Sequence, residues 1–334
     1  MRSTMNTSKI LLLAACLGTA AGSHAQDAQL SQFDAAPILL NPALTGMYEG
    51  SDFRMSSNLR SQWNSIGNTF LTTGFAYDAL VNERYGAGAY ISNYDMAGLM
   101  NTFEFGVTSS YNVSEANAEH TLSVGLRAGI IYKKISEPEL LFDQQYNDGY
   151  FDPDLPSGEQ FQRGARLMPE LGLGVAYRSK SDRRRVNPFA NFAAFHVTTP
   201  DESILRTAKH ELPIRWSFMG GCDIEVNDIV MLKPMGLYWR QGADQQVNVG
   251  LLGLVSIGGS AYSVIGGVSH RLNDAVIAHA GLRHKNNMYR FSYDVTTSEL
   301  RSYTNNNGAF EFSIVYFATH SGREARRRVQ SKSF

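Results

Sequence analysis

The stretch Thr121–Lys133 reads TLSVGLRAGIIYK, and its side chains alternate in character. Apolar residues stand at every even position from Leu122 to Tyr132, and small or polar residues stand at every odd position except Ile131. A period of two indicates a β-strand, because successive side chains of a strand point to opposite faces of a sheet. This segment is therefore predicted to be a strand with one apolar and one polar face.

The same alternation recurs along the rest of the chain. The other segments that carry it are 50–60, 69–79, 84–93, 102–111, 171–178, 187–197, 211–226, 230–240, 245–257, 260–269, 276–283, 288–296 and 310–316. Strands of about ten residues have the length needed to cross a bilayer at a tilt. We therefore predict an all-β fold, a transmembrane antiparallel β-barrel of about 14 strands of the outer-membrane type.

Tyrosines at strand ends help to separate this fold from a soluble β-sandwich or propeller, whose strands also alternate. Tyr77, Tyr111, Tyr177 and Tyr316 would share the apolar face near one end of the strands, with Tyr132 near the other end. Amphipathic rings favour the headgroup layer of a bilayer, where they form aromatic girdles. Their positions favour the membrane barrel.

The first 25 residues have the features of a secretory signal peptide. Arg2 and Lys9 precede the apolar run 10–17, and the small residues of Ser23-His24-Ala25 suit cleavage after Ala25. An alternative is a lipobox over residues 13–16, which would make Cys16 a lipidated N-terminus. Cleavage after Ala25 leaves Cys222 as the single cysteine, so no disulfide can form within the mature chain.

The remaining chain is predicted to have three parts. Residues 26–49 are a periplasmic segment or one that enters the barrel, 50–318 form the barrel, and 319–334 are a basic periplasmic tail. An even number of strands returns both termini to the periplasm. The short turns would then lie on the periplasmic side, and the long connections 135–165 and 198–210 would lie on the outer side of the membrane.

Composition and motifs argue against an enzyme. Without Arg2 and Lys9 the formal net charge changes from −1 to −3, which disfavours a nucleic-acid binder. The histidines match no zinc signature, no nucleophile elbow is present, and the nearest serine–histidine pair, Ser269-His270, would point to opposite faces. We expect no catalytic residue and no cofactor. Calcium in the acidic loop 143–154 is an alternative to a plain surface loop.

Candidate contacts with other proteins lie outside the strands. Aromatic residues Tyr146, Tyr150 and Phe151 would form a contact patch on one long loop, and the loop from Asp201 to His210 is a second candidate. The tail carries Arg326-Arg327-Arg328, either as a disordered basic extension or as a docking segment for an acidic periplasmic partner.

Several short motifs resemble those of the PorP/SprF family of type IX secretion and gliding proteins of Bacteroidetes. They are Gln29-Leu30-Ser31-Gln32-Phe33, Asn41-Pro42-Ala43-Leu44-Thr45-Gly46, Arg60-Ser61-Gln62-Trp63, Gly281-Leu282-Arg283, Phe291-Ser292-Tyr293-Asp294-Val295, Ser298-Glu299-Leu300 and Glu311-Phe312-Ser313. Within them Asn41, Pro42, Gly46, Arg60, Trp63, Ser292, Tyr293 and Asp294 are taken as the family signature. The chain differs from the family pattern in its basic tail without cysteine, and in Ala28 after Asp27.

The resemblance implies a non-enzymatic outer-membrane component of the type IX machinery. It would support export or surface attachment of adhesin-like cargo that bears a type IX C-terminal signal domain, and it would contact the periplasmic ring of the secretion and gliding motor. The expected partners are therefore outer-membrane lipid, the ring components and the cargo signal domain, with no nucleic acid.

A passive diffusion porin is the main alternative, and it requires an open, charged lumen. Inward glycines such as Gly86, Gly88 and Gly172 would instead leave room for a plug or a bound strand. The segment Asn41–Gly46 reads as a rigid turn, and the sequence leaves open whether it plugs the barrel or docks in the periplasm.

Overall fold

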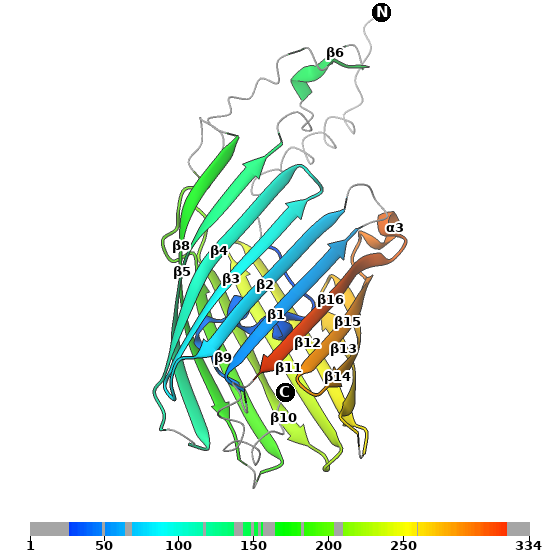
Figure 1. The fold of residues 1–334 in the computed structure, drawn as a ribbon. Coiled ribbons are helices and arrows are strands. Elements are labelled where there is room, and N and C mark those ends of the chain that lie inside the picture. Colours follow the sequence, from blue (N-terminus) through cyan, green and yellow to red (C-terminus); the bar gives the residue numbers. More distant parts are fainter. Residues whose placement is uncertain are drawn as a thin grey trace, which may run out of the picture.

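The computed structural model describes residues 27–48, 51–63, 69–115, 118–136, 143–147, 150–152, 155, 164–181, 184–203, 210–258 and 260–318. Within them, fourteen antiparallel strands close into a barrel, each paired with its neighbours in sequence and with β1 paired to β16 (Figure 1). The strands are β1 Phe53–Gln62, β2 Phe70–Leu80, β3 Tyr85–Met96, β4 Met100–Asn112, β5 His120–Ile135, β8 Ala165–Ser179, β9 Val186–Phe195, β10 Arg215–Glu225, β11 Val230–Gln241, β12 Asp244–Ser256, β13 Tyr262–Arg271, β14 Ala275–His284, β15 Asn287–Thr296 and β16 Asn307–Ala318. The predicted fold class and strand number are confirmed.

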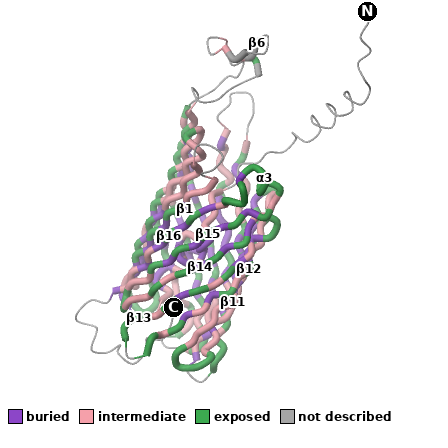
Figure 2. The backbone as a smooth tube through the Cα atoms, turned by 90° about the vertical axis from the view of Figure 1, so that its right-hand side faces the viewer, coloured by how far each residue is buried: buried purple, intermediate pink, exposed green. Residues whose placement is uncertain are grey.

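Burial along the strands is the reverse of that in a soluble protein. Leu126, which faces out of the barrel, is 61% exposed, whereas the neighbouring Arg127 faces the lumen and is 2% exposed. Figure 2 shows the same alternation of exposed and buried residues around the ring. Apolar side chains outside and polar side chains inside are what a barrel in lipid requires, because only the lumen offers partners for polar groups.

Helices in the described residues are short, and none is long and apolar enough to span a membrane. Three short helices follow one another before β1: η1 Phe33–Ala35, α2 Pro37–Leu40 and η2 Pro42–Leu44. Between β5 and β8 lie η4 Asp143–Gln145 and a small hairpin of β6 Tyr146–Asn147 with β7 Tyr150–Phe151. The connection between β15 and β16 contains α3 Arg301–Thr304.

The two ends of the barrel differ in their connections. At the end where β1 begins, turns such as 81–84 and 226–229 are short. At the other end, 136–164 and 196–214 are long, and we call this the long-loop end. The predicted asymmetry of short and long connections is therefore present.

One seam between strands is shorter than the others. The β8–β9 ladder has six residue pairs, from Leu173↔Ala194 to Arg178↔Phe189, whereas the ladder of β8 with β5 on its other side has fifteen. Beyond the short ladder, His196 adopts a positive φ of 57°, and the Val197 N–H donates to the Leu171 carbonyl. The chain thus leaves β9 while β8 continues toward the long-loop end.

The segment before β1 lies inside the ring of strands, where its short helices appear in blue in Figure 1. We call residues 27–48 the plug. The open question about Asn41–Gly46 is answered in favour of a plug, because these residues pack against the inner faces of β3, β4, β5 and β8. For residues 26–49 the sequence left open a periplasmic segment or one that enters the barrel. The described residues 27–48 lie inside the barrel, where their polar groups find partners on the barrel wall.

The ends of the described chain lie at opposite ends of the barrel. Asp27 contacts His196, which follows β9 at the long-loop end, whereas Ala318 ends β16 at the short-turn end. The plug runs along the lumen between these two ends before β1 begins. The expectation that both termini are periplasmic stays a prediction, because residues 1–26 and 319–334 lie outside the described residues.

Candidate functional site

A buried cluster of charged residues fastens the plug to the wall of the barrel. Arg60 of β1 and Asp294 of β15 form an ion pair with 2.9 Å between Nη2 and Oδ2, and Glu311 of β16 lies 3.4 Å from the same guanidinium. Arg271 of β13 also contacts Asp294, at 3.0 Å. Strands β1, β13, β15 and β16 thus each contribute one charged side chain to a single site.

Ser31 of the plug sits in the middle of this charged cluster. Its hydroxyl donates to Asp294 at 2.8 Å and accepts from Arg60 and Arg271 at 2.5 Å each, and its backbone N–H donates to Glu311 at 2.7 Å. Such hydrogen bonds with charged partners are stronger than neutral ones. The cluster therefore balances two guanidinium groups against two carboxylates around one plug serine.

Gln32 continues the same attachment. Its Nε2 donates to the Ser292 hydroxyl and to the Glu311 carbonyl, both at 3.1 Å, and its Oε1 accepts from Ser313. Every polar atom of this amide has a partner on β15 or β16. A fully satisfied buried amide fixes position as well as conformation, because leaving any of its groups unpaired is costly.

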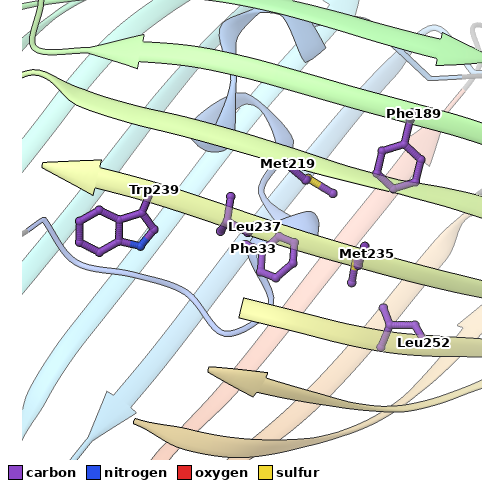
Figure 3. Packing of buried hydrophobic residues seen from close by; sticks show 7 residues of the cluster. All are labelled: Phe33, Phe189, Met219, Met235, Leu237, Trp239 and Leu252. Carbon is purple, nitrogen blue, oxygen red and sulfur yellow. The ribbon is translucent and has the colours of Figure 1, made fainter. Parts of the chain in front are cut away.

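Phe33 supplies the apolar part of the attachment. It packs with Met219, Met235, Leu237 and Trp239 on the inner faces of β10 and β11, and the cluster is completed by Phe189 and Leu252 (Figure 3). Beside it, Asp34 forms an ion pair with Arg290 at 2.5 Å. Burial opposes ionisation of Asp34, but Arg290 and Lys233 outweigh it and lower the pKa of Asp34 to about 2.

Asn41 attaches the plug to the shortest seam of the barrel. Its Nδ2 donates to the carbonyls of Val175 on β8 and Phe192 on β9, at 3.1 and 3.0 Å, while its Oδ1 accepts from the Ala43 N–H. Gly174 lies beneath it, and a Cβ at that position would clash with Asn41 Oδ1. The side chain thus bridges two strands where their own ladder is short.

The last turn of the plug rests on β2, β3 and β4. Thr45 exchanges hydrogen bonds with Thr108 and Ser110, at 2.8 and 2.6 Å. Gly46, with φ of 69°, donates its N–H to Asp78, which is paired with Arg54. A Cβ at Gly86 would clash with the Thr45 carbonyl, so the barrel wall has glycine where the plug backbone touches it.

A chain of ion pairs holds the other end of the plug. Asp27 contacts His196 Nε2 and Arg215, both at 2.7 Å, and His196 Nδ1 contacts Glu170 at 2.5 Å. Burial would raise the pKa of Asp27, but the charges of His196 and Arg215 hold it well below its ordinary value. Burial likewise disfavours protonated His196, yet the two carboxylates raise its pKa above 6.5.

These contacts describe a barrel whose lumen is occupied by its own N-terminal segment. The family model of the type IX secretion system membrane protein PorP/SprF matches residues 22–316. The chain belongs to the PorP/SprF family.

Solved structures similar to this PorP/SprF protein are outer-membrane barrels. The toluene transporter TodX of Pseudomonas putida matches with a TM-score of 0.52 and 9% identity, over 85% of this chain and 93% of that one. The CymD monoaromatic hydrocarbon channel gives 0.51 and 11%, over 86% and 93%. The toluene transporter TbuX of Ralstonia pickettii gives 0.50 and 12%, over 86% and 94%. At these identities the likeness shows the fold alone. A search of curated proteins finds no match.

The structure brings together PorP/SprF signature residues that are far apart in sequence. Arg60, Ser292 and Asp294 all bind the plug motif around Ser31, whereas Asn41 lies at the β8–β9 seam. Sequence reasoning missed Arg271, His196 and Glu170 as members of the plug attachment. Their inward positions on alternating strands were the available signal, but inward polar residues are equally expected in a water-filled lumen.

Other signature residues lie away from the plug. Tyr293 faces outward, and its hydroxyl donates to Asn307 at 2.8 Å. Trp63 directly follows β1 with φ of 59°, and its ring packs edge-on against Phe70. These two residues are found near the long-loop end and do not contact the charged cluster.

The predicted contact residues of the long loops have different outcomes. Asp201 and His210 do lie together, since the His210 N–H donates to Asp201 at 3.3 Å. Hydrogen bonds from Ser203 lower the pKa of Asp201 to about 2. Tyr146, Tyr150 and Phe151 lie on the β6–β7 hairpin, where the backbone alone is described.

Two further predictions fall wholly or partly outside the described residues. Arg326, Arg327 and Arg328 lie there, as does part of the acidic loop 143–154 that was considered for calcium. Within the described part of the chain, acidic, histidine and cysteine residues form no group able to hold a metal.

Ser269 contacts a histidine on the neighbouring strand β14. The serine that was considered with His270 instead contacts His279, with 2.9 Å between Ser269 Oγ and His279 Nε2. His279 Nδ1 has no hydrogen-bond partner, so no carboxylate orients this ring. The pair is buried in the lumen wall and lacks the third member of a catalytic triad.

Proposed function

We propose that this PorP/SprF protein is a non-enzymatic component of the type IX secretion machinery in the outer membrane. It would support export or surface attachment of adhesin-like cargo with a type IX C-terminal signal domain. The family match over residues 22–316 carries this proposal. A secretion barrel has no need of a catalytic centre, because its work is to position other polypeptides.

The occupied lumen supports this role over that of a passive porin. Diffusion porins need a continuous aqueous channel, whereas the plug of this barrel is hydrogen-bonded to β1, β13, β15 and β16 at one level and to β4, β5 and β8 at another. Cargo would therefore act at the ends of the barrel and not pass through it as a folded domain.

The long-loop end is our candidate for cargo contact. We place it at the cell surface, with the short turns in the periplasm, because outer-membrane barrels have this asymmetry. The β6–β7 hairpin with Tyr146, Tyr150 and Phe151, together with the Asp201–His210 loop, would supply the contact surface. The short turns and the basic tail with Arg326, Arg327 and Arg328 would face the periplasmic ring, where an acidic partner would bind the arginines.

Crosslinking in cells followed by affinity capture tests the proposal. The full-length protein should recover components of the type IX ring and one cargo signal domain. Charge reversal of the three arginines to glutamate should reduce capture of the ring and leave capture of cargo unchanged. Replacing Tyr146, Tyr150 and Phe151 with serine should have the opposite effect. Recovery of neither partner by the unaltered protein would contradict the proposal.

Conductance separates the two candidate functions directly. In planar bilayers the purified barrel should show little steady current, because the plug occupies the lumen and is bonded to its wall. A large, steady and weakly selective conductance of the unaltered protein would favour the porin. In cells, deletion should remove surface display of one adhesin and leave uptake of small solutes unchanged.

A further inference from the structure

A cavity of about 180 Å³ lies between the plug and the long-loop end of the barrel. The plug forms one side of it through residues 27–30, Phe33, Ala36, Leu39 and Leu40. The wall of the barrel and the start of the β9–β10 connection form the remainder. Its position gives a guest in this cavity direct contact with the plug.

Large apolar side chains line much of this cavity. Phe195, Leu237 and Trp239 contribute from the wall, and all three are buried. Met168 on β8 packs with Ile131 and Leu212, so this side of the cavity is held by its own small apolar cluster. An apolar surface of this kind favours an apolar guest, because the transfer of apolar surface out of water is favourable in free energy.

The charged side chains that line the cavity are already paired with one another. Lys133 contacts Glu202 at 2.5 Å, and Arg127 forms an ion pair with Glu104. At the plug, Asp27 is shared by Arg215 and His196, as described above. A charged guest would have to lose its hydration without gaining a free counter-ion, which is costly in a buried site. The lining therefore selects for a neutral guest.

The volume sets the size of the guest. An apolar cavity of about 150 Å³ is enough to hold benzene. From the size, the apolar lining and the paired charges, we propose that this cavity is a binding site for a small neutral molecule built on a single aromatic ring or an equivalent aliphatic group. The site is independent of the export role, so either proposal can fail without the other.

Trp239 provides a reporter inside the cavity, and Trp216 provides a matched reporter on the lipid-facing surface, where it is 44% exposed. The chain has three tryptophans. Replacing Trp63 and Trp216 with phenylalanine leaves Trp239 alone, and replacing Trp63 and Trp239 leaves Trp216 alone. Bromobenzene is a neutral single ring whose heavy atom quenches tryptophan emission, so we would titrate it into both variants in lipid nanodiscs.

Quenching of Trp239 should saturate, because the cavity holds one molecule. Quenching of Trp216 should rise in proportion to bromobenzene dissolved in the lipid. Equal, unsaturated quenching of both tryptophans would overturn the proposal, since it would show partition into the bilayer alone.

A cavity-filling variant tests the site itself. Gly74 faces the lumen and lines the cavity, and a Cβ there comes close only to the end of the flexible Leu39 side chain, at 3.2 Å, so a small shift of Leu39 accommodates it. Gly74→Leu, made in the Trp239-only background, should weaken bromobenzene binding by about tenfold or more. Gly236→Leu makes the same change where a Cβ has ordinary contacts with Val249 and Asn248, outside this cavity, and should leave binding unchanged.

Heat-modifiable migration on SDS gels shows whether each variant is folded, because a folded barrel migrates differently before and after boiling. If Gly74→Leu did not fold, Met168→Phe would fill the same cavity from β8 with a larger apolar side chain and should have the same effect. Unchanged saturable binding in a folded cavity-filling variant would refute the assignment of the site.

Discussion

Arg60 and Asp294 are 234 residues apart in the chain, yet their side chains form a 2.9 Å ion pair inside the barrel. Both contact Ser31, which belongs to neither strand. The pair therefore joins β1, β15 and the plug in one contact. Four predictions follow from the attachments of the plug.

Asp294→Asn should destabilise the barrel by about 3–5 kcal/mol, because it leaves Arg60 and Arg271 buried with less compensating charge. Equilibrium unfolding in urea, in lipid vesicles, would measure the loss. Glu83→Gln, at the exposed β2–β3 turn, makes the same carboxylate-to-amide change as a control and should change stability by less than about 0.5 kcal/mol. Equal stability of Asp294→Asn and the control would show that the charged cluster contributes little.

Asn41→Ala should loosen the plug at the β8–β9 seam. The change removes two hydrogen bonds to strand carbonyls and one to Ala43, with an expected cost of about 1–3 kcal/mol. Hydrogen exchange should become faster over residues 41–46 and over the facing part of β9. Asn286→Ala, at the exposed turn between β14 and β15, is the control and should leave both exchange rates unchanged. Unaltered protection in Asn41→Ala would contradict the role of Asn41 at this seam.

Gly125→Ala should displace the plug, because a Cβ at this position would overlap the backbone of Pro42 and Ala43. The expected result is a higher conductance in planar bilayers than that of the unaltered barrel. Gly266→Ala is the control, since a Cβ there meets nothing within 4 Å. A folded Gly125→Ala barrel with unchanged conductance would indicate that the plug does not determine the current.

The Asp27 end of the plug should be held most tightly at mildly acidic pH. Because the pKa of His196 is raised, its contribution is complete below about 6.5 and is lost as the pH rises through the raised value. Because the pKa of Asp27 is lowered, its contribution is complete above about 3.8 and is lost as the pH falls through the lowered value. Both contributions are therefore complete between these two values.

Hydrogen exchange of residues 28–30, corrected for the intrinsic effect of pH, would test this window. In the unaltered protein, the protection of these amides from exchange should fall as the pH rises above the window. His196→Gln should abolish this loss of protection at higher pH. His284→Gln, on β14 at the short-turn end, is the control and should still show it. A flat profile in the unaltered protein would refute the pH dependence.

The barrel itself was predictable from the sequence because alternation is a local property. Residues such as Leu126 and Arg127 reveal their faces through their own chemistry, and the fourteen predicted ranges each correspond to a strand. Boundaries shifted by a few residues. β8 extends well beyond the predicted 171–178, because its residues 165–172 still pair with β5 where the ladder with β9 has ended.

The plug was not predictable in the same way. Residues 27–48 have no strand or helix period, and their conformation depends on partners such as Asp294, Glu311 and Val175 that lie far along the chain. In the sequence, a polar residue that points into the lumen is the same whether the lumen holds water or protein. Gly86 was the useful signal, since it does meet the plug, whereas Gly88 and Gly172 meet side chains of the wall.

The position of the charged cluster has a consequence for how the barrel is assembled. Arg60 and Glu311 stand opposite each other in the register of β1 and β16, where the last strand of the chain meets the first. Ser31 and Gln32 donate their backbone N–H groups to Glu311, and Ser31 also accepts from Arg60. The plug thus contacts the first and the last strand at the seam that closes the barrel. Docking of the plug and closure of the cylinder at this seam therefore stabilise each other.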